Sequence, residues 1–258
     1  MIKTLLIAVS VLLLSLNFID IDINEQLPYD HKEKFNPNLA YINTTDKLER
    51  YIDSNAVAGA VDPHSIEYVD LIVDAIKNRF YHGFSHFTIK ENWIAAFSER
   101  LIGYGLASKV RPGDILQHPN AACSQQSIVM MDILRRKKIS YRNVGFPHHY
   151  ALEVLVNDKW YYFDPNMEPV LTNTDRLEEN WKLSADNLKK FYDTSRFKDL
   201  DWKFGKHLTV TKGTINEIPA ANAKFFQNAT GVISRIAFIF PLLLLYYISK
   251  RKQRNRKA

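Results

Sequence analysis

Apolar segments at both ends of the chain constrain its fold more than any other feature. The segment from Thr4 to Ile19 holds no charged residue and follows Lys3. Residues 231–249, "GVISRIAFIFPLLLLYYIS", are followed by the tail "KRKQRNRKA". An apolar stretch with a cationic flank is typical of a signal segment or a membrane span. We therefore expect residues 20–230 to lie together on one side of a membrane.

The N-terminal segment is short for a membrane span. Its 16 residues would extend about 24 Å as a helix, against a hydrocarbon core of about 30 Å. The small residues of a cleavage site are missing near its end, where "NFIDID" follows, and this favours a retained anchor over a cleaved signal. A buried helix of a soluble protein is the alternative for either terminal segment.

The positive charge of the chain is concentrated beside these segments. Eight cations lie there, and removing them from the net charge of +6 leaves −2 for the rest: Lys3, Arg235, Lys250, Arg251, Lys252, Arg254, Arg256 and Lys257. Cations mark the cytoplasmic flank of a span, so we expect both termini in the cytoplasm and the central part outside a bacterial inner membrane. Lipid is the partner expected at both termini. Nucleic acid is not, because the rest of the chain is slightly acidic.

The stretch between the apolar segments is predicted to form one folded domain. Residues 20–60 are polar and carry the turn signals "LPYD" and "NPN", which predicts a loosely packed lead-in. The remaining divisions are residues 1–19 as anchor or signal, 61–230 as the extracytoplasmic domain, 231–249 as a transmembrane helix and 250–258 as a basic tail. Cys123 is the only cysteine, so the domain has no internal disulfide.

Two helices are predicted in the first part of the domain. The first begins with Asp62 as N-cap and Pro63 as first helical residue, and its apolar face comprises Ile66, Val69, Ile72, Val73, Ile76 and Phe80. The second begins with the capping box "TIKE" at residues 88–91 and ends before Gly103. Its apolar residues recur at helical spacing, which predicts that they face a core: Ile94, Phe97 and Leu101.

A third predicted helix carries the cysteine. In "HPNAACSQQSIVMMDILRRKK", Asn120 is a suitable N-cap, which places Cys123 at the third helical position. Unpaired N–H groups and the helix dipole stabilise a thiolate in the first turn, and the thiolate is the nucleophilic form of cysteine. Position alone also fits an inert buried thiol.

The segments that follow this helix resemble a known enzyme core. After "CSQQ" come "KISYRNV", "HYALEV" and "WYYFDP" in order. Residues 117–165 thus resemble the transglutaminase-like superfamily, in which a cysteine at a helix start precedes a Gly-Ile-x-x-Arg-like segment, an H-x-x-x-E-V strand and a W-x-x-x-D-P strand. The resemblance implies an α+β, papain-like fold in which the cysteine-bearing helix packs on an antiparallel sheet.

The resemblance also implies a catalytic triad of Cys123, His149 and Asp164. His149 is favoured over its neighbour His148 because Glu153 follows it at the family's spacing of four residues. In such triads the imidazole takes the thiol proton, and the carboxylate orients the imidazole. A turn-capping role is the alternative for Asp164.

Two groups are candidates for stabilising the oxyanion of such a reaction. The backbone N–H of Cys123 lacks a helical partner in the first turn. Gln117 lies six residues upstream, which resembles the separation between the oxyanion glutamine and the cysteine of papain-like enzymes. A surface-loop role is the alternative for Gln117.

Strand geometry decides whether the triad can assemble. The pair "ND" at 157–158 separates two apolar runs and tolerates the positive φ of a tight hairpin turn. A two-residue turn there sets Asp164 opposite Ala151, so that Asp164 and His149 project from the same face as diagonal neighbours. A loop one residue longer would send Asp164 to the other face.

Other site types fit the sequence less well. Ser124 stands where calcium-dependent animal cross-linking relatives have tryptophan, and the sequence holds no carboxylate-rich calcium loop. The closer likeness is to bacterial transglutaminase-like proteins, which include proteases and amidases. A zinc site would draw on residues without a familiar ligand spacing, namely His82, His86, His118, His148 and Cys123. We expect no metal and no cofactor.

The expected function is thiol-dependent chemistry on an amide. The resemblance implies a cysteine protease, amidase or acyltransferase that forms a thioester at Cys123 with a peptide or another amide-bearing substrate. The alternative is a non-catalytic binding or assembly module for a cell-envelope or polysaccharide system. An intact triad argues against that alternative, since binding alone does not need it.

The membrane arrangement predicts the outcome of a protease-protection experiment. In cells with permeabilised outer layers, added protease should digest residues 20–230 and spare the tail, because the cations beside both spans face the cytoplasm. Immunoblots against the central segment and against a tag on the tail measure this. A protected central segment would overturn the extracytoplasmic assignment.

Overall fold

The computed structural model describes residues 1–24, 27–182, 185–194, 197, 199–205 and 210–255, and it is an α+β structure. Its contacts divide the chain into two units. The first, here called the terminal unit, comprises Met1–Glu25, His86–Lys109 and Ala220–Ala258. The second, the sheet unit, comprises Gln26–Ser85 and Val110–Pro219. The single domain predicted over 61–230 is therefore divided between the two.

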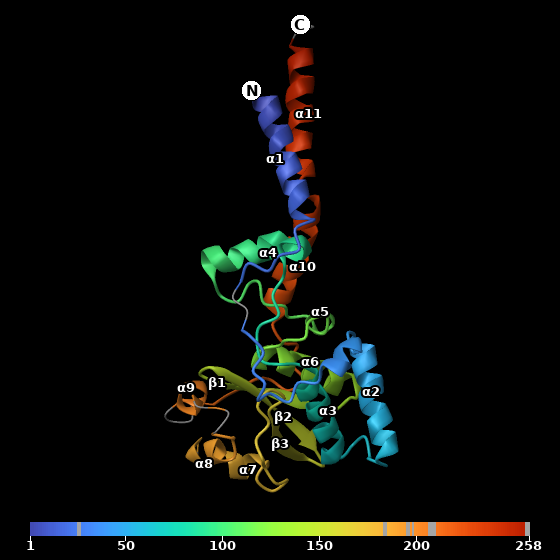
Figure 1. The fold of residues 1–258 in the computed structure, drawn as a ribbon, viewed down its shortest axis with the longest axis vertical. Coiled ribbons are helices and arrows are strands. Elements are labelled where there is room, and N and C mark those ends of the chain that lie inside the picture. Colours follow the sequence, from blue (N-terminus) through green and yellow to red (C-terminus); the bar gives the residue numbers. More distant parts are fainter. Residues whose placement is uncertain (25–26, 183–184, 195–196, 198, 206–209, 256–258) are drawn as a thin grey trace. The chain divides into compact units, whose positions relative to one another are not determined.

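The sheet unit is built on a four-stranded antiparallel sheet, as predicted. Its strands follow the order β3-β2-β1-β4 (Figure 1). They are β1 (Tyr141–Phe146), β2 (His149–Val156), β3 (Lys159–Phe163) and β4 (Thr211–Lys212). Tight connections between β1, β2 and β3 keep these three strands adjacent in space.

The hairpin between β2 and β3 has the predicted two-residue turn. Asn157 and Asp158 have φ of 48° and 59°, the left-handed conformation that such turns require. The paired residues run from Val156 with Lys159 to Leu152 with Phe163. The register is therefore confirmed, and the residue after β3 is Asp164.

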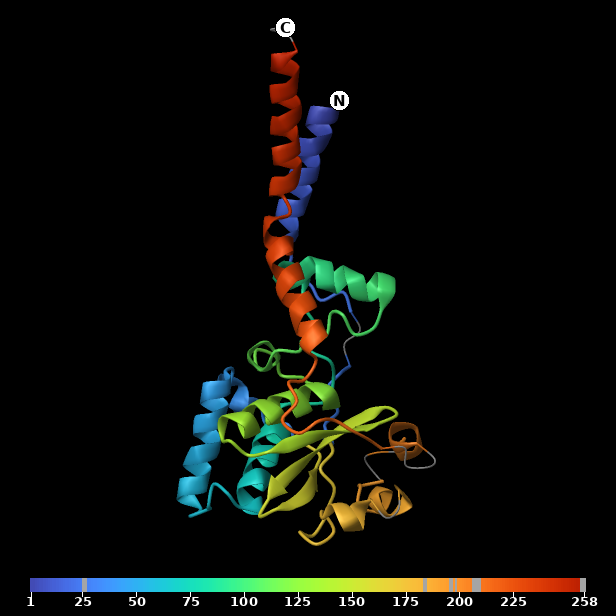
Figure 2. The same ribbon diagram turned by 180° about the vertical axis from the view of Figure 1, so that it is seen from behind.

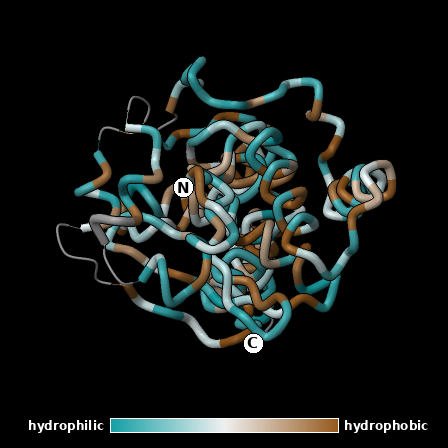
Figure 3. Tube along the Cα trace, turned by 90° about the horizontal axis from the view of Figure 1, so that it is seen from below, coloured by the Kyte–Doolittle hydropathy of each residue, from teal (hydrophilic) through white to brown (hydrophobic). Residues whose placement is uncertain are grey.

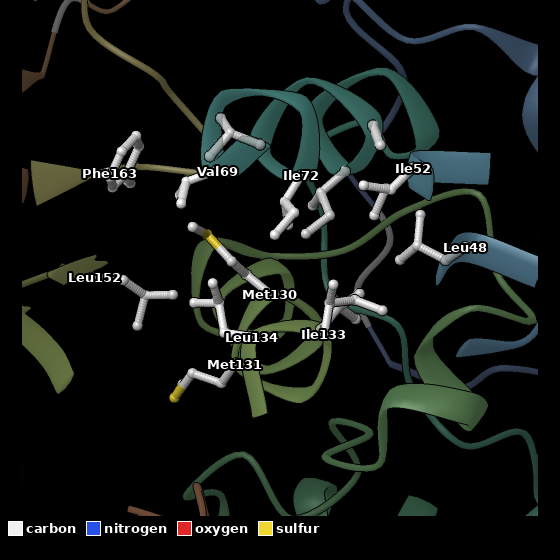
Figure 4. Packing of buried hydrophobic residues seen from close by; sticks show 14 of the residues in the cluster. Leu48, Ile52, Val69, Ile72, Met130, Met131, Ile133, Leu134, Leu152 and Phe163 are labelled. Atoms are coloured by element: carbon white, nitrogen blue, oxygen red, sulfur yellow. The ribbon is translucent and has the colours of Figure 1, made fainter. Parts of the chain in front are cut away.

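Three helices share a buried core with one face of the sheet (Figure 2). They are α2 (Thr45–Ala58), α3 (Ile66–Arg79) and α6 (Cys123–Arg136). α6 packs directly on the sheet, while α2 packs against the other two helices. Figure 4 shows their side chains pointing to a common centre with side chains of the sheet: Leu48, Ile52, Val69, Ile72, Met130, Ile133, Leu134, Leu152 and Phe163. Each fully buried aliphatic side chain of this kind stabilises the fold by about 1.5–3 kcal/mol.

The opposite face of the sheet packs against three short helices. They are α7 (Glu178–Trp181), α8 (Ala185–Lys190) and α9 (Leu200–Phe204), which contribute Trp181, Leu188 and Phe204 to a second buried cluster. Side chains alternate along a strand, so Ala151 of β2 lies in this cluster while Leu152 lies in the first. By the same alternation His149 faces the layer of α7 to α9.

The prediction of a loosely packed lead-in over residues 20–60 is wrong. Part of it forms the short helix η1 (Pro37–Tyr41), and a further 14 residues form α2. The Thr44 hydroxyl accepts the Lys47 N–H at 3.2 Å and caps α2. Its buried residues Leu48, Ile52 and Ala56 recur every four residues. Along this helix, at the right of Figure 3, hydrophobic and hydrophilic residues alternate.

The helix predicted from Asp62 begins three residues later. Ser65 is the N-cap of α3, and its hydroxyl accepts the N–H of Tyr68 at 3.3 Å. Asp62 instead accepts the N–H of His64 at 3.0 Å, a local turn that competes with helix formation. The predicted apolar face is buried from Val69 onwards.

The terminal unit contains four longer helices: α1 (Ile2–Leu16), α4 (Ile89–Ile102), α10 (Ala221–Ile236) and α11 (Ile239–Arg254). α1 and α11 lie side by side in Figures 1 and 2. The capping box predicted for α4 is confirmed. Its packed side combines the apolar residues Ile89, Ala95 and Ala96 with the buried Asn92, whose amide donates to the Thr230 hydroxyl at 2.9 Å. Phe97 and Leu101, predicted to face a core, are 37% and 83% exposed.

The single helix predicted over residues 231–249 is broken at Ala237 and Phe238. Pro241 explains the break, since it has no N–H and its ring clashes with the carbonyl four residues earlier, that of Ala237. The Ser10 hydroxyl of α1 donates to the Phe238 carbonyl at 2.5 Å, satisfying an acceptor at the break. No single helix in the described part of the chain is long and apolar enough to cross a membrane; α10 and α11 qualify only together, across a bend of 53°.

The hairpin turn predicts a difference between two substitutions at one position. Asp158→Val should lower the free energy of unfolding by about 1–2 kcal/mol, because a β-branched residue is strained in the left-handed conformation. Asp158→Gly should leave it unchanged or raise it. Urea unfolding of the detergent-solubilised chain measures both values. Equal stability of the two variants would show that the turn does not need positive φ at this position.

Candidate active site

Cys123 is the first residue of α6. The N-cap is Ala122, two residues after the predicted Asn120. The alanine side chain has no acceptor that could cap the helix. Gln125, inside the first turn, supplies one instead: its Oε1 accepts the N–H of Ala122 at 3.2 Å and that of Ser85 at 2.8 Å. The first-turn position of the thiol is therefore confirmed, although the helix begins later. The positive end of the helix dipole lies at the cysteine.

His149 and Asp164 meet as the hairpin geometry predicts. Nε2 of His149 lies 2.6 Å from Oδ2 of Asp164, and both side chains are 0% exposed. The two residues come from the start of β2 and from just beyond β3. Since the turn between these strands has two residues, both side chains project into the same layer of the sheet unit.

The two oxygens of Asp164 have different partners. Oδ1 accepts the backbone N–H groups of Asn166 at 3.1 Å and Met167 at 3.0 Å. Oδ2 contacts His149 and accepts the Tyr192 hydroxyl at 2.9 Å. Asp164 thus caps the turn after β3 and orients the imidazole at once, so both roles considered for it are present.

The electrostatics of the three groups favour a thiolate–imidazolium pair. Burial alone would raise the pKa of Cys123, but the imidazole of His149 and the N–H of Tyr150 lower it. Burial would lower the pKa of His149, but the Asp164 carboxylate raises it to about 9. Burial would raise the pKa of Asp164, and the charge of His149 lowers it. Asp164 therefore stays ionised and holds the proton on the ring.

The side chains of the three predicted triad residues differ in their exposure to solvent. Cys123 is half-buried, whereas His149 and Asp164 are fully buried. The His149 ring stacks on Phe146 at 6.2 Å between centroids and contacts Phe204 at 5.2 Å. A ligand would therefore meet the sulfur first, while the histidine and aspartate remain away from solvent.

His148, the rival histidine, does not join the group. It is exposed, and its ring stacks on Trp202 with centroids 4.0 Å apart and an interplanar angle of 2°. Its backbone N–H donates to the carbonyl of Lys203 at 3.0 Å. The geometry therefore selects His149 as the partner of Asp164.

The remaining residues of the resembling segments form a structural cluster. Arg142 and Glu153 are opposite each other on β1 and β2, and Nε of Arg142 lies 2.6 Å from Oε2 of Glu153. Glu153, which is 0% exposed, also accepts Trp181 Nε1 at 3.1 Å and pairs with Lys212 at 2.9 Å. The Arg142 guanidinium lies 4.2 Å from the ring centroid of Trp160. These residues pair the buried Glu153 carboxylate, which lies on the same face of β2 as His149, and so compensate its lost hydration.

Gln117, the predicted oxyanion donor, lies elsewhere. Its side-chain Nε2 donates to the carbonyl of Asn43 at 2.7 Å in an exposed contact. Its amide is therefore directed to the backbone of Asn43 and not to Cys123. Its amide group ties the segment between η1 and α2 to the loop before α6, which is the surface role considered as its alternative.

His82 is a residue near the triad to which the sequence assigned no role in catalysis. Burial, together with the charges of Lys203 and His149, lowers its pKa to about 4. Its Nδ1 is buried without a hydrogen-bond partner among the described residues. Among those residues no group of three or more His, Cys, Asp or Glu side chains is arranged to hold a metal ion. The pairing that brings His82 to the triad is long-range, so no local pattern signals it.

Comparisons with family models, with curated proteins and with solved structures find no match to this chain.

The coupled pKa values predict how Cys123 reacts. Alkylation should proceed well below pH of about 8.5, where an ordinary thiol titrates, because His149 stabilises the thiolate. His149→Ala should move the reaction to higher pH, since the largest influence that opposes the effect of burial on the thiol pKa is then lost. Iodoacetamide labelling followed by mass spectrometry gives the profile. His148→Ala is the matched control and should leave it unchanged; a profile also unchanged in His149→Ala would mean that Cys123 is an ordinary thiol.

Proposed function

We propose that this chain is a membrane-tethered thiol enzyme of transglutaminase-like type. It cleaves or transfers an amide-linked acyl group through a thioester at Cys123. The observation that carries the proposal is the 2.6 Å contact between His149 and Asp164, fully buried, beside a half-buried cysteine at a helix start. A thiol, a base and a carboxylate in this relation are the parts that nucleophilic catalysis requires.

Acylation begins with the thiolate of Cys123. The sulfur attacks the carbonyl carbon of the amide, and the oxygen takes the negative charge of the tetrahedral intermediate. When the intermediate collapses, the C–N bond breaks and the imidazolium of His149 gives its proton to the leaving nitrogen. The products of this step are a free amine, a neutral imidazole and a thioester.

Deacylation uses the same groups in reverse. Neutral His149 removes a proton from water or from an amine, which attacks the thioester carbonyl. The C–S bond breaks, and the thiolate and the imidazolium are restored. Asp164 stabilises the charged ring in both steps and takes no proton itself. No cofactor is needed, because every proton and electron pair moves between substrate and side chains.

The terminal segments support a location at a bacterial inner membrane. Many apolar residues of α1, α10 and α11 are exposed, and the basic tail begins within the end of α11, whose last turn holds Arg251, Lys252 and Arg254. In this proposal both ends are held in the membrane with the cations inside. The enzyme then acts on peptide or other amide groups in the extracytoplasmic space.

The proposal predicts a covalent acyl-enzyme. The full chain in detergent is treated with an electrophilic acyl probe derived from an amide, and the adduct is located by mass spectrometry. The adduct should fall on Cys123. His149→Ala should slow its formation about 10²–10⁴-fold, the usual contribution of a general acid or base. Asp164→Asn, which keeps the shape of the side chain, should also slow it.

Two outcomes would count against the proposal. No acylation of the wild-type chain by a panel of amide, ester and thioester probes would favour a non-catalytic binding module. Labelling that persists in His149→Ala at the wild-type rate would mean that the thiol reacts without the triad.

Adding a primary amine then distinguishes the two forms of the reaction, since transfer gives a new amide while hydrolysis gives the acid.

A further inference from the structure

A chain of buried hydroxyl groups ends on the carboxylate of Asp164. The Tyr192 hydroxyl donates to Oδ2 of Asp164 at 2.9 Å, and the hydroxyls of Tyr162 and Tyr192 lie 2.8 Å apart. A tyrosine has a single O–H proton, and Tyr192 gives its proton to the carboxylate, so Tyr162 is the donor between the two tyrosines. The hydrogen bonds therefore run from Tyr162 to Tyr192 and from Tyr192 to Asp164.

Packing fixes both tyrosines in place. Tyr162 is 0% exposed and lies two residues before Asp164, so both side chains project from the same side of the sheet. Tyr192 is 3% exposed, and its ring centroid lies 4.9 Å from that of Phe204, which also contacts His149. Burial and the charge of Asp164 raise the pKa of both hydroxyls well above the usual range, so both stay protonated and act as donors.

Two groups share one oxygen of Asp164. Nε2 of His149 lies 2.6 Å from Oδ2, and the Tyr192 hydroxyl donates to the same atom. A hydrogen bond to the ionised form of a carboxylate favours that form and lowers its affinity for a proton. Tyr192 therefore weakens the hold of Asp164 on the proton of the imidazolium. Among the described residues no third group bonds Oδ2, so the balance at this oxygen depends on one hydroxyl.

The proposed reaction needs an imidazolium that is stable and yet acidic. It must keep its proton to stabilise the thiolate, and it must then release that proton to the leaving nitrogen. We propose that Tyr192 is a positioning residue for this proton transfer: by bonding Oδ2 it keeps Asp164 from holding the His149 proton too tightly for release. The inference rests on the proposed function, because the release belongs to acylation.

Other titratable and charged groups act on the same chain of side chains from the elements packed around it. Burial, together with the charges of Lys203 and His149, keeps His82 neutral by lowering its pKa to about 4. Burial raises the pKa of Glu168 to about 7, so this carboxyl titrates within the range of the measurements. A substitution that removes only a hydroxyl leaves all these groups in place: Cys123 of α6, His82, Glu153 of β2, Glu168, Arg176 and Lys203 of α9.

The first test removes the hydroxyl and follows the proton. Tyr192→Phe keeps the ring and deletes the donor to Oδ2. Nitrogen-15 NMR of the full chain in detergent, with labelled histidine, gives the pH midpoint at which His149 loses its proton. That midpoint should rise by about 0.5–1 pH unit, within the strength of one hydrogen bond to a charged group. The pH midpoint for alkylation of Cys123 by iodoacetamide should not rise, because the imidazolium still stabilises the thiolate.

The second test compares two leaving groups. An amide probe needs a proton on its leaving nitrogen, whereas a thioester probe with the same acyl group loses a thiolate that needs none. Tyr192→Phe should slow acylation of Cys123 by the amide about 3–10-fold, because a more tightly held proton is a weaker general acid. Acylation by the thioester should stay within about twofold of wild type, since it does not use that proton.

Three further variants complete the design. Tyr162→Phe removes the donor to Tyr192 but leaves the bond to Asp164, so it should cause smaller changes in the same direction. The double variant Tyr162→Phe/Tyr192→Phe leaves neither hydroxyl buried without a partner and keeps the test decisive if Tyr192→Phe is unstable. Tyr161→Phe is the matched control, because Tyr161 lies on the other face of β3, in the first core cluster, and should change neither result. Urea unfolding of each variant checks the fold.

The outcomes separate this inference from the proposed function. An unchanged His149 midpoint in Tyr192→Phe and in the double variant overturns the inference, because the ring then only fills space. A lower midpoint, with alkylation moved to higher pH as in His149→Ala, also overturns it. If the variant slows the amide and the thioester equally, the role in proton release is overturned and the proposed function stands. If neither probe acylates wild type, the proposed function fails and the inference fails with it.

Discussion

The buried contact between His149 and Asp164 determines how the rest of the site is arranged. A carboxylate with 0% exposure is unfavourable unless positive charge and hydrogen bonds compensate its lost hydration. Here the compensation comes from the imidazole, two backbone N–H groups and the Tyr192 hydroxyl. Because Asp164 remains charged, His149 can hold its proton, and because His149 is charged, the thiolate of Cys123 is stabilised.

The sheet brings together groups that belong to different layers. His149 and Asp164 face the layer of α7 to α9, whereas α6 packs on the other face. Cys123 is the first residue of its helix, and there the imidazole of His149 and the N–H of Tyr150 both lower the pKa of its thiol. A cysteine in the middle of α6 would be enclosed in the first core cluster.

Local patterns in the sequence predicted the parts of this site that depend on residue spacing and on the number of residues in the hairpin turn. The two turn residues Asn157 and Asp158 fix which face Asp164 occupies, and the structure follows that rule. Helix starts were less predictable, because Gln125 caps α6 from inside the helix while Asn120 was free to serve elsewhere. α2 was missed because the turn signals of residues 20–60 outweighed a sparse stripe of three buried residues.

The remaining errors involve contacts between distant parts of the chain. Gln117 has the spacing of an oxyanion donor, but a carbonyl 74 residues away takes its amide. The bridge between Tyr81 and Asn120, which no local pattern signals, places the segment that holds His82 beside the chain that enters α6. The break before Pro241 was predictable in principle, since proline lacks an N–H. The hydrogen bond that the Phe238 carbonyl accepts at this break was not, because its donor, the Ser10 hydroxyl, comes from the other end of the chain.

The protonation state of His149 tests the central claim most directly. Nitrogen-15 NMR of the full chain with labelled histidine reports how many protons each imidazole carries. We predict that His149 is doubly protonated at pH 7 and loses a proton only near pH 9, in keeping with its raised pKa. Replacement of the thiol in Cys123→Ala should lower that midpoint. A His149 ring that is neutral at pH 7, with a titration unaffected by Cys123→Ala, would contradict the account.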